Sequence, residues 1–313
     1  MNRINPSFVD DTTFHTDVNY IESLWQRHTV GGVDMPIIDI GEGEPVVFVP
    51  ILEHLEFVYA RQIRALSQHY RVILYRRHET RTRPVGLPER AEELRRLLDS
   101  LEIPSAHFIA HGDAAMVLFE FATRSPQRCR SLILIAQGAD YQIAPHPFIW
   151  LLHEIFVRLP IEHFLPAWFL RRTVINYITA SNPATTQTRA VPRLPRYLIE
   201  EQFHKIQLWP FVYKFSVLPV IHYFDMRNRL SALTMPILLI NRFDDALSPE
   251  VKTHWLSAQL SDCDYHVIPG GERFFMYSQA ETVTQLIEQF LTAHVSPERT
   301  TPNSLQKNDI TSS

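Results

Sequence analysis

Short apolar runs alternate with longer amphipathic segments over much of the chain. Continuous apolar runs of this length are typical of strands buried in a parallel sheet, and they occur at 45–51, 70–77, 106–112 and 130–138. The segments between them have the helical spacing of one apolar face, at 56–69, 88–102 and 113–128. The pattern predicts repeated strand and helix units, and therefore an α/β fold with a mostly parallel sheet and helices on both faces.

The pattern begins and ends in ways that add strands to this sheet. Residues 20–44 contain two strand-like segments around Gly31 and Gly32, a pair that favours a hairpin and hence an antiparallel edge. The alternation returns near the end of the chain, with strands at 235–242 and 263–271 and helices at 249–260 and 279–295.

The alternation is interrupted for about a hundred residues, where aromatic helical segments are punctuated by prolines and no strand pattern is evident. We therefore expect an inserted, all-helical cap. The last residues are polar and aperiodic, as in a disordered tail. The predicted organisation is a core of 20–139 and 234–295, a helical cap of 140–233, an N-terminal extension of 1–19 and a disordered tail of 296–313.

Composition excludes several classes of protein. The 30 Lys and Arg residues against 34 Asp and Glu residues give a net charge of -4, so we expect no nucleic-acid partner. Two cysteines and 15 scattered histidines do not form a metal-ligand pattern, and we expect neither a metal nor a cofactor. The N-terminus lacks the apolar segment of a signal peptide, which favours a cytoplasmic location. Only 9 of 313 residues are glycine, whereas about 7% is average.

The strand order and the position of the insertion resemble the α/β-hydrolase fold. The resemblance covers residues 22–295 and is carried by RSLILIA, by LSALTMPILLINRFDDALSPE and by YHVIPGGERFFMYSQAETVTQLIEQFL. It implies a nucleophile on a tight turn between strand and helix, a catalytic histidine before the last helix, and an acid after a late strand.

The nucleophile position implied by this resemblance holds no side chain. The family's turn reads G-x-S-x-G, and the small residues Ala110 and Ala114 align Gly112 with the serine. Asp113 is an alternative nucleophile, but shifting the alignment places His111 where the turn requires a small residue. We expect Asp113 to lie at the N-terminus of the following helix, where a carboxylate is favoured.

The positions implied for the histidine and the acid also differ from the family pattern. Alignment on Pro269 and Phe274 places Arg273 where the histidine belongs, and arginine cannot accept a proton as a general base. Asp244 aligns with the acid, and Asp245 is the adjacent alternative. The expected replacement of the acid and histidine pair is an ion pair between Asp244 and Arg273.

The loop after the first parallel strand implies that oxyanion stabilisation is lost as well. It begins with Pro50, which has no N–H group to donate, and runs through Glu53 to His54. A second loop, after 70–77, contains several arginines that form a solvated surface or an anion site, Arg76, Arg77, Arg81 and Arg83.

Candidate ligand-binding residues lie where the predicted strands end. Ligands of open α/β sheets bind at the carboxyl ends of strands, and the polar residues expected there are His54, His78, His111, Asp113 and Arg76. The sequence thus predicts a degenerate α/β-hydrolase-fold protein that binds a hydrophobic small molecule or a protein partner between core and cap. In its loss of a triad it resembles the N-myc downstream-regulated family.

Two alternatives stay open. One is an enzyme, a hydrolase or a lyase, with a non-standard site that uses Asp113, His111, His54 or Glu53 as acid or base. The other is a membrane-peripheral scaffold that makes contact through the aromatic cap. The sequence names neither the ligand nor the oligomeric state.

Overall fold

The computed structural model describes residues 8–79, 82–140, 147–160, 163–179, 191–206, 209, 211–221, 224–243, 245 and 248–294. In this part of the chain, eight strands form one sheet. They are β1 (Gln26–Val30), β2 (Val33–Ile40), β3 (Pro45–Phe48), β4 (Arg71–Tyr75), β5 (Ala106–His111), β6 (Cys129–Ile135), β7 (Ile237–Arg242) and β8 (Cys263–Ile268).

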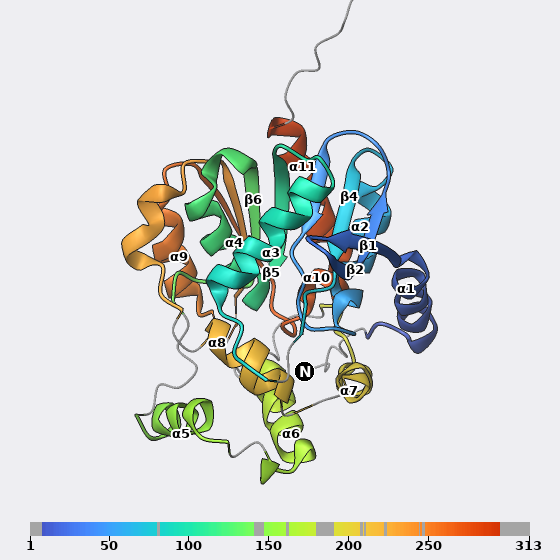
Figure 1. The fold of residues 1–313 in the computed structure, drawn as a ribbon. Helices are drawn as coiled ribbons and strands as arrows, with labels where there is room; N and C mark the ends of the chain where they lie inside the picture. Colours follow the sequence, from blue (N-terminus) through green and yellow to red (C-terminus); the bar gives the residue numbers. More distant parts are fainter. Residues whose placement is uncertain are drawn as a thin grey trace, which may run out of the picture.

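The strands lie in the order β1-β2-β4-β3-β5-β6-β7-β8. The pairs β1/β2 and β2/β4 are antiparallel, and all pairs from β4 to β8 are parallel. The central strands β5, β6 and β7 are almost entirely buried, as continuous apolar runs predict. The expected α/β class with a mostly parallel sheet is therefore confirmed (Figure 1).

Helices cover both faces of this sheet. Helices α3 and α4 pack on each other in front of the sheet, whereas α11 lies behind it and packs on α2 (Figure 1). The helices outside the predicted cap are α1 (Asp11–Leu24), α2 (Ala60–Leu66), α3 (Leu87–Ser100), α4 (Asp113–Arg124), α9 (Glu250–Gln259), α10 (Phe275–Ser278) and α11 (Ala280–His294), with 3-10 turns η1 (Glu56–Tyr59) and η2 (Pro126–Arg128).

The predicted hairpin joins β1 to β2. Val30 pairs with Val33, so the loop is the two-residue turn Gly31-Gly32, and both glycines have positive φ angles of 56° and 84°. Two positive φ angles are what a tight hairpin turn requires, and glycine adopts them without steric cost.

The N-terminal part differs from the sequence-based expectation, because α1 occupies residues expected to be an extension and the start of a strand. Asp10 caps the helix by accepting a hydrogen bond from the Thr13 N–H at 2.9 Å. Phe14, Val18 and Ile21 form its buried face at helical spacing. These two signals, read together, would have predicted the helix.

Helix α1 is tied to distant parts of the chain through one buried carboxylate. Asp17 accepts hydrogen bonds from Arg61 Nε at 2.9 Å and Arg64 Nη1 at 2.8 Å, both on or beside α2. It also accepts one from the Tyr277 hydroxyl on α10 at 3.0 Å. The first helix of the chain is therefore joined to one of the last.

Between 140 and 233 the described residues contain helices and two isolated β-bridges. The elements are α5 (Pro147–Arg158), α6 (Ala167–Ile178), α7 (Arg196–Lys205), the π-helical turn η4 (Tyr213–Val217), α8 (Leu218–Ile221) and η5 (Arg227–Ala232). Helices α5 to α8 gather at one end of the sheet (Figure 1). Val85 N, in the loop after β4, donates to Phe215 O at 2.8 Å and joins the two parts.

The boundaries of the predicted domains stay a prediction. The expected disordered tail of 296–313 lies outside the described residues. No helix in the described part of the chain is both long and apolar enough to cross a bilayer.

Candidate functional site

The turn between β5 and α4 is formed by Gly112, whose φ and ψ angles are 59° and −126°. Its N–H donates to Ile135 O on the neighbouring strand at 2.9 Å. This is the sharp strand-to-helix turn expected from the resemblance, with glycine at its strained position. Because glycine has no Cβ, the strain is small and the turn presents no reactive atom.

The space above Gly112 is occupied by Arg273. A Cβ placed on Gly112 would lie 3.4 Å from Arg273 Nη2, 3.7 Å from Nε and 4.0 Å from Cζ. The edge of the guanidinium formed by Nε and Nη2 thus lies against the point where a nucleophilic side chain would begin. The Arg273 side chain is buried.

Asp245 holds this guanidinium in place. Arg273 Nη1 donates to Asp245 Oδ1 at 3.1 Å and to Oδ2 at 3.3 Å, and Arg242 Nε donates to Oδ2 at 3.2 Å. The Ser248 N–H donates to Oδ1 at 2.8 Å. The sequence left Asp244 and Asp245 as alternatives for the acid, and Asp245 makes the pair with Arg273. Asp244 lies outside the described residues.

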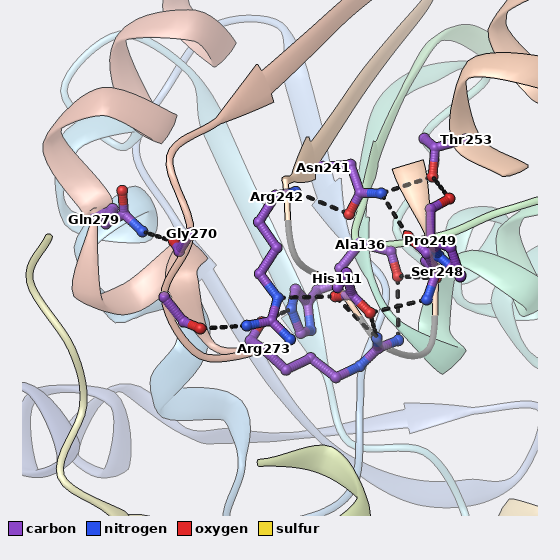
Figure 2. A network of polar contacts seen from close by, with 12 residues as sticks. His111, Ala136, Asn241, Arg242, Ser248, Pro249, Thr253, Gly270, Arg273 and Gln279 are labelled. Atoms are coloured by element: carbon purple, nitrogen blue, oxygen red, sulfur yellow. Dashed lines mark hydrogen bonds and ion pairs between the residues drawn. The ribbon is translucent and has the colours of Figure 1, made fainter. Parts of the chain in front are cut away.

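Backbone carbonyls complete the network shown in Figure 2. Arg273 Nη2 donates to Ala136 O at 3.1 Å, and this oxygen also accepts from Ser248 Oγ at 3.1 Å. Arg242 donates from Nη1 to Gly271 O. Asn241 positions the Ser248 loop by donating to Ser248 O at 2.7 Å. Both guanidinium groups are therefore fixed by the carboxylate and by backbone oxygens together.

His111, beside the turn, is buried and neutral. Its Nε2 lies 2.8 Å from Arg273 O, and since a carbonyl only accepts, Nε2 carries the proton. Burial, together with the positive charge of Arg273, lowers the pKa of His111 to about 4. The ring stacks on Phe274 with centroids 6.0 Å apart. The one lone pair left to accept a proton is on Nδ1.

Asp113 is the first residue of α4, as the sequence predicts, but it makes no capping hydrogen bond. Instead its carboxylate lies 3.4 Å from Arg77 Nη1. Arg77 is almost fully buried and also donates to Glu79 at 2.6 Å. Asp113 is therefore a partner of the loop after β4.

Arg76 and His78 line a cavity of about 190 Å³, which Met35, Ile51 and Glu53 also line. Arg76 is ion-paired to three carboxylates. Its Nε lies 2.9 Å from Glu56, its Nη2 lies 2.8 Å from Glu22, and its Nη1 lies 3.7 Å from Glu53.

The arginine run in this loop was considered as a possible anion site. Arg77 pairs with Glu79 and Asp113, and Arg83 pairs with Glu89 at 2.7 Å. Arg81 lies outside the described residues. The described members of this run are paired with carboxylates, and an anion site in this loop stays a prediction.

His54 does not line that cavity, although it lies close to it. It has a positive φ of 67°, uncommon for a residue with a side chain, and its Nε2 lies 3.8 Å from Glu53. Burial lowers the pKa of His54. Arg76 and His78 therefore line the cavity, whereas His111 and Gly112 contact Arg273. Asp113 connects the two sets, because it follows Gly112 and pairs with Arg77, which also lines the cavity.

Sequence reasoning missed Glu56. Burial raises the pKa of this carboxyl group to about 7, and Arg76 opposes the rise. Its position on an apolar segment, Leu55-Glu56-Phe57-Val58-Tyr59, was the available signal, because a charge within such a run requires a buried partner. Among the residues described, no group of three or more His, Cys, Asp or Glu is arranged to hold a metal ion.

Comparison with known proteins identifies the fold of the chain. No protein-family model matches it. It is 26% identical over 232 residues to a putative carbamate hydrolase RutD of Stutzerimonas stutzeri, covering 72% of this chain and 83% of that protein. It is 23% identical over 277 residues to the protein of that description from Caulobacter vibrioides, covering 85% and 98%.

Solved structures give the same result. An esterase from Thermogutta terrifontis superposes with a TM-score of 0.68 at 19% identity, covering 86% of this chain and 98% of its own. An enol-lactonase from Burkholderia xenovorans superposes with a TM-score of 0.68 at 18% identity, covering 85% and 100%. The chain has the α/β-hydrolase fold.

Proposed function

We propose that this chain uses the α/β-hydrolase scaffold for binding rather than for hydrolysis by a serine, histidine and acid triad. The bound species is a hydrophobic small molecule or a protein partner, held between the sheet and the helices of 140–233. The observation that carries the proposal is the position of Arg273, whose guanidinium covers Gly112 and pairs with Asp245.

Each part of a triad mechanism meets a specific obstacle at this place. Gly112 has no attacking atom, and an arginine side chain offers no lone pair to act as a general base at the position of Arg273. Pro50 follows β3 by two residues and has no N–H for an oxyanion. Electrostatic stabilisation and proton transfer are both removed, and each is a major source of rate enhancement.

The second candidate is a hydrolase or lyase with a non-standard site. The relatives favour it, since those reported above are named as hydrolases or an esterase. In this chain the groups available to it are His111 through Nδ1, Asp113, whose carboxylate is partly exposed, and the pair His54 and Glu53. Among the described interactions, none joins the side chain of one of these residues to a hydroxyl or thiol nucleophile.

A substrate panel separates the two candidates. We would assay the full chain with p-nitrophenyl esters of several chain lengths, a lactone and an unsubstituted carbamate, beside His111→Gln and Asp113→Asn variants. The binding proposal predicts turnover at the buffer rate for all three proteins. Turnover about 100-fold above buffer that either variant abolishes would establish the enzyme instead.

Two further measurements bear on the proposal. The double variant Gly112→Ser/Arg273→His restores the two missing groups, and we expect it to stay inactive because the oxyanion donors are also absent. High activity in this variant would show that the loop after β3 still stabilises an oxyanion. If the bound species is a small molecule, native mass spectrometry of the purified chain should reveal an apolar molecule that co-purifies with it.

A further inference from the structure

Helix α5 exposes several of its apolar side chains and buries its acidic one. Leu151 and Ile155 are one turn apart on this exposed face, and Leu159 continues it just past the end of the helix. Leu152, beside them, is also exposed, whereas the Glu154 side chain is almost completely buried. Surface helices of globular proteins show the opposite arrangement.

Helix α6 and the turn before it also expose apolar side chains, here aromatic rings. Phe164 is 83% exposed and Trp168 is 63% exposed, and the Phe169 ring lies edge-on to Trp168 with centroids 6.0 Å apart. Arg172 lies one turn beyond Trp168 and is also exposed. We define the α5–α6 patch as Leu151, Leu152, Ile155, Leu159, Phe164, Trp168 and Phe169.

Inward-facing contacts of α5 fix this orientation. The Phe156 ring packs on Tyr213 of η4, with centroids 5.9 Å apart. Lys214, buried on the same turn, donates from Nζ to Leu159 O at 2.6 Å. Glu154 is paired with Arg158 at 2.7 Å. Because these contacts satisfy charged groups on the inner side, the leucines are left facing outward.

Helix α6 is held in a similar way. Ile175 is buried, and Arg171 Nη2 donates to Ile206 O at 3.0 Å. Arg196 of α7 donates from Nη2 to Asn176 Oδ1 at 2.6 Å. The side of α6 that carries Trp168 and Phe169 is therefore the outer side.

The charges beside the patch indicate which partner it fits. Among the described residues of α5 and α6, the exposed charged side chains are Arg158, which is 72% exposed, and Arg172. Arg158 is paired with the buried Glu154, so the exposed positive charge of these two helices comes from Arg172 and from the outer part of the Arg158 guanidinium. Trp, Phe and Leu side chains flanked by arginines are the composition of helices that lie in the interface of an anionic bilayer. A second copy of this chain is less suited as the partner, because a symmetric dimer would bring Arg158 and Arg172 of one copy close to the same residues of the other.

We propose that the α5–α6 patch docks on the surface of an anionic lipid bilayer. The rings of Phe164, Trp168 and Phe169 enter the headgroup region, and Arg158 and Arg172 contact lipid phosphates. The helices lie in the plane of the interface. This inference does not depend on whether the chain binds or hydrolyses its ligand.

Vesicle co-sedimentation with the full chain tests the proposal. We would compare vesicles of phosphatidylcholine alone with vesicles containing about 30 mol% phosphatidylglycerol. The variants are Phe164→Ser/Trp168→Ser, which removes the two most exposed rings, and Arg172→Gln. The matched control is Val251→Ser/Trp255→Ser on α9, since these residues are also one turn apart and are 75% and 42% exposed.

The proposal predicts binding to the anionic vesicles that falls at least about tenfold in Phe164→Ser/Trp168→Ser and is unchanged in the control. Arg172→Gln should reduce the preference for anionic over neutral vesicles. Absence of binding by the unaltered chain, or equal loss in the control, would overturn it. Sedimentation equilibrium adds a third arm, because a dimer that Phe164→Ser/Trp168→Ser converts to monomers, without vesicle binding, would identify a second copy as the occupant.

Discussion

Arg273 and Asp245 form an ion pair from which water is excluded, with Nη1 at 3.1 Å and 3.3 Å from the two carboxylate oxygens. The Asp245 side chain has no exposed surface, and that of Arg273 has almost none. Removing one member of such a pair leaves a buried charge without compensation, which is far more costly than losing an exposed pair. The pair therefore contributes to the integrity of the fold as well as covering Gly112.

The first prediction concerns the relative cost of losing each partner. Asp245→Asn should lower the free energy of unfolding by about 3–5 kcal/mol, because Arg273 and Arg242 both lose their carboxylate. Arg273→Met should cost less, since Asp245 keeps Arg242 and the Ser248 N–H. Urea unfolding of both variants measures the difference.

The exposed pair of Arg27 and Asp34 provides the control for these variants. Arg27→Met should change the free energy of unfolding by less than about 1 kcal/mol. If Arg273→Met proves more costly than Asp245→Asn, the carboxylate is not the shared centre of the network.

The second prediction concerns the turn at Gly112. Gly112→Ala should destabilise the chain by about 1–2 kcal/mol, because an L-residue is strained at a φ of 59°, whereas the new Cβ would make only ordinary van der Waals contact with Arg273. Gly86→Ala is the control, since Gly86 has a negative φ of −90° and the nearest atom lies 3.7 Å from its Cβ position. Equal thermal stability of the two variants would show that the turn is not strained.

The third prediction is a pH dependence from Glu56. The folded state holds the pKa of this carboxyl near 7, above its usual value near 4.5, so folding favours the protonated form. Its contribution to stability is complete below pH 4.5 and is lost as the pH rises through 7. The loss is about 3 kcal/mol over that interval.

Glu56→Gln should abolish this contribution while still accepting a hydrogen bond from Arg76. Urea unfolding at pH 5 and at pH 8 should show the variant gaining stability relative to the unaltered chain at the higher pH. A difference between the two proteins that does not change with pH would mean that Glu56 is ionised at pH 5 in the folded state.

The fourth prediction has the opposite sign and concerns His111. Its folded pKa of about 4 lies below the usual 6.5, so the unfolded chain binds the proton more readily. The His111 contribution is present above pH 6.5 and is lost as the pH falls toward 4, by about 3 kcal/mol. Calorimetric melting at pH 7 and pH 4.5 should show a smaller acid-induced drop for His111→Gln than for the unaltered chain, whereas His15→Gln, at an exposed histidine, should behave like the unaltered chain.

The sheet could be predicted because its strands carry their own signal. Continuous apolar runs such as those of β6 and β7 reflect burial on both faces, and Gly31-Gly32 identifies the hairpin by its backbone requirement. Helix α1 was missed because its apolar residues are separated by polar ones and follow no strand pattern. Only the cap at Asp10 together with that spacing identifies it.

The candidate site was less predictable because it depends on side-chain direction. Sequence spacing identified the turn at Gly112 but could not decide whether Asp244 or Asp245 pairs with Arg273, since the direction of a side chain in an irregular loop is set by packing and not by a repeating pattern. It also placed Arg76, His78 and His111 at the ends of strands without separating them. Their division into two groups follows from the packing of η1 and the loop after β4, which no local pattern encodes.

The contact between Asp17 and Tyr277 spans 260 positions of sequence. During synthesis from the N-terminus, the partner of this carboxylate is made only when the chain is nearly complete. Helix α1 can contact α2 earlier through Arg61 and Arg64, but its hydrogen bond to Tyr277 should be among the last contacts to form during folding on the ribosome.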